Sequence, residues 1–112
     1  MKNFNNKVAA ITGAASGIGR ALALNLAREK CDLALSDVNE VGLQETAEQA
    51  RALGVKVTTT KVNVADRAAM HAWADQVVKD HGKVNLIFNN AGVALGNTVE
   101  DASYEDYEWI MG

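Results

Sequence analysis

Four short apolar runs alternate with three segments in which apolar residues recur every three or four positions. The runs lie at residues 7–12, 33–36, 55–62 and 84–88, and their aliphatic and β-branched content is typical of strands. The segments between them predict helices. Because neighbouring parallel strands need a crossover connection, this alternation predicts an α/β domain built on a parallel sheet.

The predicted helices carry start and stop signals. The first begins near Ile18, Asp66 is placed as N-cap of the third, and Gly54 and Gly82 stand where the second and third should stop. The positions expected to pack are Leu22, Leu26 and Ala27 in the first helix, Leu43, Ala47, Ala50 and Leu53 in the second, and Ala69, Met70, Trp73, Ala74 and Val77 in the third.

The stretch TGAASGIG follows the first predicted strand and opens the first helix. Gly13 permits a sharp turn, Gly17 removes a Cβ where a diphosphate would approach the backbone, and Gly19 allows close helix–strand packing. The free N–H groups of the helix then face an anion. A tight turn without a ligand is the alternative, but the strand–loop–helix context favours a dinucleotide.

Asp37 ends the second predicted strand, where a carboxylate accepts hydrogen bonds from both hydroxyls of an adenosine ribose. It would repel a 2′-phosphate, and its neighbours Ser36, Val38 and Asn39 are uncharged. Ser16, not an arginine, precedes the second glycine. These residues favour NAD over NADP. Taken alone, Asp37 is typical of an ordinary turn.

Asn89-Asn90-Ala91-Gly92 directly follows the fourth predicted strand. Small and amide residues at the carboxyl end of a parallel strand suit a crevice for a flat ligand. The asparagines are expected to satisfy carbonyls and amides of neighbouring loops and strands. In isolation the same residues would indicate only a turn.

Together TGAASGIG, Asp37 and NNAG resemble the short-chain dehydrogenase/reductase family, and the resemblance extends from Lys7 to the end of the chain. It implies a Rossmann-type doubly wound parallel sheet with strand order 3-2-1-4 in this portion. It also implies an NAD-dependent oxidoreductase that transfers hydride between nicotinamide and an alcohol or ketone.

The resemblance further implies the cofactor-binding positions. Asn63 departs from the family pattern, which commonly has aspartate there, so an amide oxygen would meet the adenine amino group. The implied set is Gly13, Ser16, Gly17, Ile18 and Gly19 at the diphosphate, Asp37 at the adenosine ribose, Asn63 and Val64 at the adenine, and Asn89, Ala91 and Gly92 at the nicotinamide ribose.

No catalytic residue is assigned. In the family the catalytic tyrosine is followed four residues later by lysine, whose charge lowers the pKa of the phenol. Here Tyr104 is followed by Glu108 and Tyr107 by Met111, and both tyrosines are expected to pack in a short helix instead. We therefore expect residues 1–112 to form one incomplete dinucleotide-binding domain that lacks the catalytic half.

Two rival functions stay open. The chain could be a non-catalytic nucleotide-binding or interaction module, complete as it stands, or a Rossmann domain for another ligand such as S-adenosylmethionine. A substrate is expected only for the complete enzyme, and a homo-oligomer is possible.

Composition and charge narrow the possible classes of protein. The 112 residues carry a net charge of −3 and no basic cluster, which argues against nucleic acid. No apolar run could cross a membrane. One cysteine, Cys31, indicates a reducing, cytoplasmic location and a small half-buried side chain. His71 and His81 are expected on the surface, with no metal site.

Overall fold

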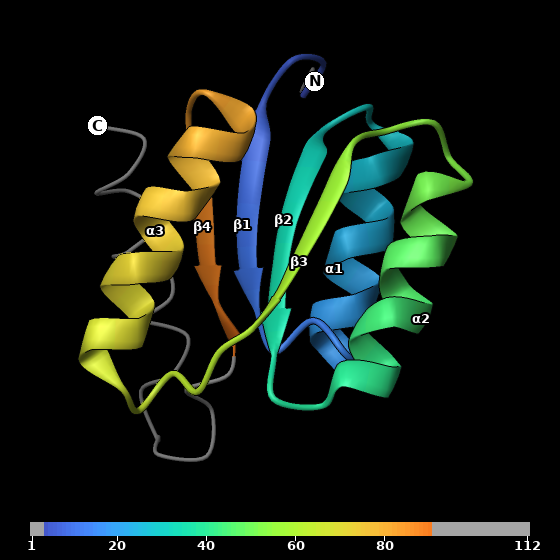
Figure 1. Ribbon diagram of the computed structural model, residues 1–112. Coiled ribbons are helices and arrows are strands. Elements are labelled where there is room, and N and C mark those ends of the chain that lie inside the picture. Colours follow the sequence, from blue (N-terminus) through green and yellow to red (C-terminus); the bar gives the residue numbers. More distant parts are fainter. Residues whose placement is uncertain (1–3, 91–112) are drawn as a thin grey trace.

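The computed structural model describes residues 4–90, which form a four-stranded sheet with helices on both faces (Figure 1). Strands and helices alternate as predicted. The elements are β1 (Val8–Thr12), α1 (Gly17–Arg28), β2 (Asp32–Asp37), α2 (Glu40–Arg51), β3 (Val57–Lys61), α3 (Arg67–His81) and β4 (Leu86–Asn89).

The sheet has the strand order β3-β2-β1-β4, and every pairing is parallel. Thr12, the last residue of β1, pairs with Ser36 of β2 on one side and Asn89 of β4 on the other. This register aligns the carboxyl ends of the strands along one edge. The α/β class and the 3-2-1-4 order are therefore confirmed.

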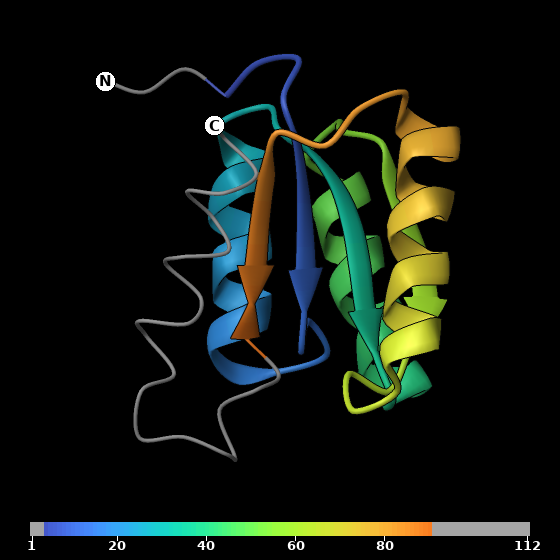
Figure 2. The ribbon, with the colours of Figure 1, turned by 90° about the vertical axis from the view of Figure 1, so that its left-hand side faces the viewer.

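Alternate residues of each strand enter two separate cores, because successive side chains point to opposite faces of a sheet. Ala9 and Ile11 of β1 face α1 and α2, whereas Val8 and Ala10 face α3. Figure 2 shows α1 and α3 on opposite sides of the strands. Burial on both faces explains why β1 is apolar throughout and does not alternate.

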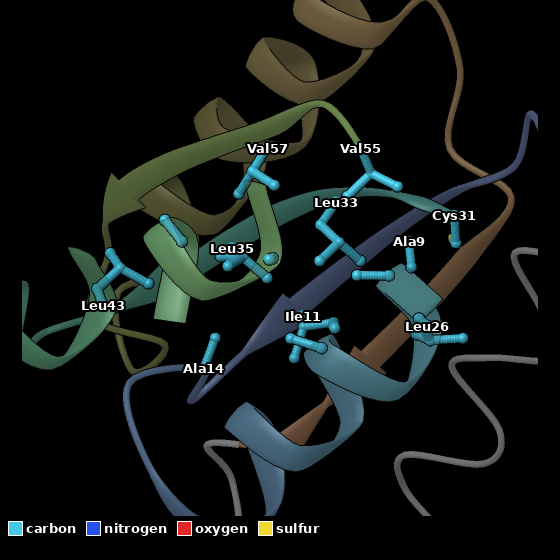
Figure 3. Packing of buried hydrophobic residues seen from close by; sticks show 14 of the residues in the cluster. Ala9, Ile11, Ala14, Leu26, Cys31, Leu33, Leu35, Leu43, Val55 and Val57 are labelled. Atoms are coloured by element: carbon cyan, nitrogen blue, oxygen red, sulfur yellow. The ribbon is translucent and has the colours of Figure 1, made fainter. Parts of the chain in front are cut away.

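The core between the sheet and the α1–α2 pair is the larger of the two (Figure 3). Leu33 and Leu35 of β2 and Ile11 of β1 are fully buried there beneath Leu43 of α2 and Leu26 of α1. Small residues fill the helix sides that face this core. These are Ala23 and Ala27 in α1 and Ala47 and Ala50 in α2, and they let the helices approach the sheet closely.

The third helix begins and ends as predicted. The Asp66 side chain accepts a hydrogen bond from the Ala69 amide at 3.0 Å, and Gly82 closes the helix with φ of 83°. Such a cap stabilises a helix by about 1 kcal/mol. The expectation for Ala74 is wrong, because its side chain is exposed; Trp73 and Val77 alone are fully buried along this helix.

The second helix stops earlier than its sequence signal. It ends at Arg51, and Gly54 follows with φ of 95° in the turn that leads to β3. Leu53 lies in that turn and packs against the core from outside the helix. Gly54 thus marks the reversal of the chain and not the helix terminus itself.

Two further expectations need correction. Cys31 is fully buried, not half-buried, and this burial raises the pKa of its thiol to about 12, so the side chain is an unreactive part of the core. His81 is half-buried beside β3, whereas His71 is exposed as predicted.

Residues 4–90 hold no cluster of metal-ligating side chains, and no helix among them is long and apolar enough to span a membrane.

Candidate functional site

The connections β1–α1, β2–α2 and β3–α3 all lie at the edge where the parallel strands end (Figure 1). Ligands of open α/β sheets bind at this edge. The Val62 amide donates to the Asp37 carbonyl at 3.3 Å, so the segment that follows β3 runs beside the end of β2. Candidate residues from three separate stretches of sequence are thereby brought to one edge of the sheet.

The glycine loop between β1 and α1 needs its glycines for different reasons. Gly13 and Gly17 have φ of 67° and 59°, a region that residues with a Cβ rarely adopt. A Cβ on Gly19 would lie 1.9 Å from the Gly13 carbonyl oxygen, so the first turn of α1 packs directly on the loop. A Cβ on Gly17 would meet no heavy atom within 4 Å, which leaves the backbone there open to a ligand.

The N-terminus of α1 is available to an anion. Ser16 occupies the N-cap position but its side chain makes no capping hydrogen bond, and the first turn holds no acidic residue. The first N–H groups of a helix have no partner within the helix and carry its positive dipole end. Ile18 lies in this turn and is 72% exposed to solvent.

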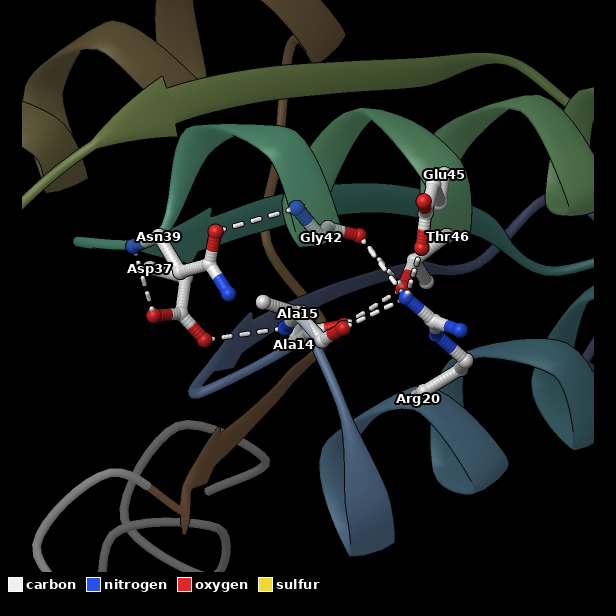
Figure 4. A network of polar contacts seen from close by, with 8 residues as sticks. All are labelled: Ala14, Ala15, Arg20, Asp37, Asn39, Gly42, Glu45 and Thr46. Carbon is white, nitrogen blue, oxygen red and sulfur yellow. Dashed lines mark hydrogen bonds and ion pairs between the residues drawn. The ribbon is translucent and has the colours of Figure 1, made fainter.

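The Asp37 carboxylate lies against the glycine loop (Figure 4). Its Oδ2 accepts a hydrogen bond from the Ala15 amide at 2.9 Å, and its Oδ1 accepts one from the Asn39 amide at 3.0 Å. These two bonds fix the rotamer, and the partly exposed carboxylate keeps further acceptor capacity. A carboxylate is thus held beside the helix N-terminus before any ligand arrives.

Asn63 and Val64 follow β3 at the same edge. Asn63 is exposed and its Oδ1 accepts a hydrogen bond from the Ala65 amide at 2.9 Å, which shapes the turn that leads into α3. Val64 is partly buried. The amide oxygen expected to meet an adenine therefore already has one backbone donor, and it retains one lone pair.

The end of β4 is joined to the glycine loop by its asparagines. The Thr12 hydroxyl donates to Asn89 Oδ1 at 3.0 Å, and Asn90 Nδ2 lies 3.5 Å from the Gly13 carbonyl oxygen. The expectation that these amides satisfy backbone groups of neighbouring loops and strands is confirmed for Asn90, whereas Asn89 contacts a side-chain hydroxyl of β1. Ala91 and Gly92, like Tyr104 and Tyr107, lie outside the described residues.

Sequence reasoning missed a second set of polar residues behind the glycine loop (Figure 4). Arg20 of α1 donates from Nη2 to the Ala15 carbonyl at 2.6 Å and from Nε to the Thr46 hydroxyl at 2.8 Å. Thr46 of α2 is fully buried and lies 2.8 Å from the Ala14 carbonyl oxygen. The available signal was Gly42, a glycine directly before the first packing position of the second predicted helix, since a glycine there indicates close backbone approach.

The geometry fits the diphosphate and ribose of a dinucleotide. An open glycine backbone and a free helix N-terminus suit a diphosphate, and the Asp37 carboxylate beside them suits a pair of sugar hydroxyls.

Comparison with known proteins agrees with this geometry. The family model for short chain dehydrogenases matches residues 7–111. A Mycobacterium tuberculosis protein named "Putative oxidoreductase SadH" is 49% identical over 99% of this chain and 40% of its own length. Cyclohexanol dehydrogenase from an Acinetobacter species is 41% identical over 96% of this chain and 43% of its own length. The chain thus spans about two fifths of these curated relatives.

Solved structures give the same result. A short-chain dehydrogenase/reductase from Burkholderia phymatum in complex with NAD matches with a TM-score of 0.74 at 42% identity, over 79% of this chain and 31% of that one. NAD⁺-bound xylitol dehydrogenase matches with a TM-score of 0.76 at 38% identity, over 78% and 34%. With a family model covering nearly its whole length and a sheet of the matching order, the chain belongs to the short-chain dehydrogenase family.

Proposed function

We propose that this chain binds NAD and provides the cofactor-binding part of an oxidoreductase that transfers hydride between nicotinamide and an alcohol or ketone. The observation that carries the proposal is the Asp37 carboxylate, held 2.9 Å from a glycine-loop amide beside the free end of α1. Relatives named for cyclohexanol and xylitol dehydrogenation support an alcohol as the class of substrate.

Each proposed contact follows from the chemistry of the residues. Amides of Ser16, Gly17, Ile18 and Gly19 hold the diphosphate at the start of α1, where the helix dipole favours negative charge. Asp37 accepts from the adenosine ribose hydroxyls and disfavours a 2′-phosphate by repulsion.

The remaining proposed contacts lie on either side of the diphosphate, toward the adenine and toward the nicotinamide. Gly13 belongs to the diphosphate site, Asn63 and Val64 lie at the adenine end, and Asn89, Ala91 and Gly92 belong to the nicotinamide half. When bound, the dinucleotide supplies the hydride acceptor or donor.

Titration of the purified chain with NAD⁺ and NADP⁺ tests the proposal directly. We expect NAD⁺ to bind at least about tenfold more tightly than NADP⁺, because a like-charge contact across a binding site costs more than about 1.4 kcal/mol. We expect Asp37→Ala to weaken NAD⁺ binding by about tenfold or more and to abolish most of this preference.

Asp75→Ala is the matched control, since it removes the same charge from an exposed position on α3. It should leave both affinities unchanged. Equal affinities for NAD⁺ and NADP⁺ in the unsubstituted chain would refute the ribose role of Asp37. Saturable binding of S-adenosylmethionine with no binding of NAD⁺ would identify a different Rossmann ligand.

We also propose that the chain by itself does not turn over alcohols. Its sequence holds no tyrosine followed four residues later by lysine, the spacing that places an ammonium one helical turn from a phenol and lowers its pKa. Absorbance at 340 nm should stay flat when the chain is mixed with NAD⁺ and cyclohexanol. A sustained rise would contradict the assignment.

A further inference from the structure

Every backbone polar group of Ala14 and Ala15 has a partner, although both residues are buried. Their amides donate to β2, Ala14 to the Ser36 carbonyl at 3.1 Å and Ala15 to Asp37 Oδ2 at 2.9 Å. Their carbonyls accept from the opposite direction, Ala14 from Thr46 and Ala15 from Arg20. The Ala14–Ala15 peptide plane is therefore fixed at both its carbonyl and its N–H, and the next plane, Ala15–Ser16, is fixed at its carbonyl.

Arg20 and Thr46 form a linked pair, here termed the loop clamp (Figure 4). The Thr46 hydroxyl accepts from Arg20 Nε at 2.8 Å and donates its single proton to the Ala14 carbonyl at 2.8 Å. Arg20 Nη2 also donates to the Gly42 carbonyl at 3.0 Å. The clamp joins the first turn of α1, the glycine loop and α2 through one network.

The close approach of α2 to the loop is a second, independent observation. A Cβ on Gly42 would lie 2.8 Å from the Ala15 carbonyl oxygen and 3.0 Å from Ala15 Cβ. Residue 42 must therefore be glycine for the clamp to reach the loop. α2 thus packs against the loop residues that precede the N-terminus of α1.

The direction of these carbonyls matters for a bound anion. A carbonyl oxygen carries partial negative charge, and rotation of the Ala15–Ser16 plane would turn that charge toward a diphosphate and turn the Ser16 N–H away from it. Rotation of the Ala14–Ala15 plane would likewise move a carbonyl oxygen out of its place and would break the bond from the Ala15 N–H to Asp37. The clamp holds both oxygens toward α2. A correctly oriented loop then binds an anion without reorganising its backbone.

We propose that Arg20 and Thr46 are positioning residues that hold the Ala14 and Ala15 carbonyls away from the diphosphate, so that the glycine loop is prepared for the dinucleotide. This inference rests on the proposed binding of NAD. It assigns neither residue a contact with the ligand. It also makes α2 part of the machinery that prepares the site.

The decisive experiment compares Thr46→Val with Thr46→Ser. Valine has the shape of threonine but no hydroxyl, whereas serine keeps the hydroxyl. Each variant is titrated with NAD⁺, with ADP-ribose and with adenosine, which has no phosphate, well below its midpoint of thermal unfolding. We expect Thr46→Val to weaken NAD⁺ and ADP-ribose binding about tenfold, as one lost hydrogen bond does.

Adenosine is the ligand that separates positioning from general destabilisation. Its affinity should change less than about twofold in Thr46→Val, because Asp37 keeps its bond from the Asn39 amide. Thr46→Ser should bind all three ligands like the unsubstituted chain. Equal NAD⁺ affinity in Thr46→Val and Thr46→Ser, or a parallel loss of adenosine, would overturn the proposal.

Arg20→Lys and Glu45→Gln complete the set. Lysine retains the charge but not the fork that reaches Thr46 and two carbonyls together, so we expect intermediate NAD⁺ affinity. Glu45 pairs with Arg20 at 3.1 Å from an exposed position, and its loss should have no effect.

The two proposals fail in distinguishable ways. Unchanged affinity in both Arg20→Lys and Thr46→Val would overturn the inference and leave NAD binding intact. Failure of the unsubstituted chain to bind NAD⁺ would overturn both.

Discussion

The two faces of the sheet differ in the size of their cores and in how their buried polar groups are bonded. The face under α1 and α2 holds the larger core, with buried alanines and backbone in direct contact at Gly19 and Gly42. Its buried Thr46 hydroxyl is part of a continuous network with the partly exposed Arg20 side chain. The face under α3 has a smaller core around Trp73 and Val77.

The α3 face also holds the two buried polar side-chain atoms without a hydrogen-bond partner in residues 4–90, Ser36 Oγ and His81 Nδ1. Ser36 alternates with Leu35 along β2 and so points to the α3 side. Unpaired buried polar groups destabilise a fold. The proposed diphosphate-binding loop therefore rests on the face that holds neither of these unpaired atoms.

The largest expected effect comes from Gly19→Ala. Its Cβ would collide with the Gly13 carbonyl oxygen, a backbone atom that cannot move without displacing the loop. We expect the free energy of unfolding to fall by about 3 kcal/mol or more, measured by urea denaturation. Gly17→Ala is the control, since it meets only open space and should cost about 1 kcal/mol for its positive φ. A similar fall in the free energy of unfolding for Gly19→Ala and Gly17→Ala would show that the collision with the Gly13 carbonyl oxygen adds no cost.

Thr46→Val should destabilise the fold by about 1–3 kcal/mol, because it leaves the buried Ala14 carbonyl and the partly buried Arg20 Nε without their partner. Urea unfolding of this variant and of Thr46→Ser measures the effect. The serine variant should lose much less. A stable Thr46→Val protein would contradict the view that the polar network supports the α1–α2 face.

On the α3 face, His81 should make stability depend on pH. Burial lowers the pKa of His81 below its usual value, the Lys56 ammonium lowers it further, and Asp32 and Asp80 oppose this only in part. The imidazolium carries N–H groups on both nitrogens, and Nδ1 is buried without an acceptor, while Nε2 lies 2.9 Å from the Thr58 hydroxyl.

Because the folded pKa is lowered, the unfolded chain binds the proton first as the pH falls. The free energy of unfolding should therefore be fully present above about pH 6.5 and decline below it. His81→Gln should flatten this decline, measured by urea unfolding between about pH 7.5 and 5. His71→Gln, at an exposed position on the same helix, should keep it. Identical slopes in all three proteins would count against a role for His81.

The smallest effect is expected from Ser36→Ala. Its hydroxyl is buried without a partner on the α3 face, so its removal should be neutral or stabilise the fold by up to about 1 kcal/mol. Thermal unfolding against the unsubstituted chain measures the change. A loss comparable to that of Thr46→Val would show that the two faces do not differ in the way their hydroxyls are used.

Local sequence signals predicted the elements well because their physical causes are local. Asp66 caps a helix with its own side chain, and Gly82 reverses a helix because it has no Cβ. Ala74 was misjudged because helical period alone does not say how wide the buried stripe of α3 is. In residues 4–90, α3 is the helix that covers that face of the sheet, and only a narrow stripe of α3 is buried.

The amino-acid sequence by itself determined the α/β order, the glycine loop and the acid that follows the second strand, because each depends on residue type and short-range spacing. Only the tertiary structure decided that Asp37 reaches Ala15, that Arg20 and Thr46 meet behind the loop, and that His81 is half-buried. These contacts join residues 22 to 26 positions apart in the chain. Side-chain direction and helix packing set such contacts, and no local pattern encodes them.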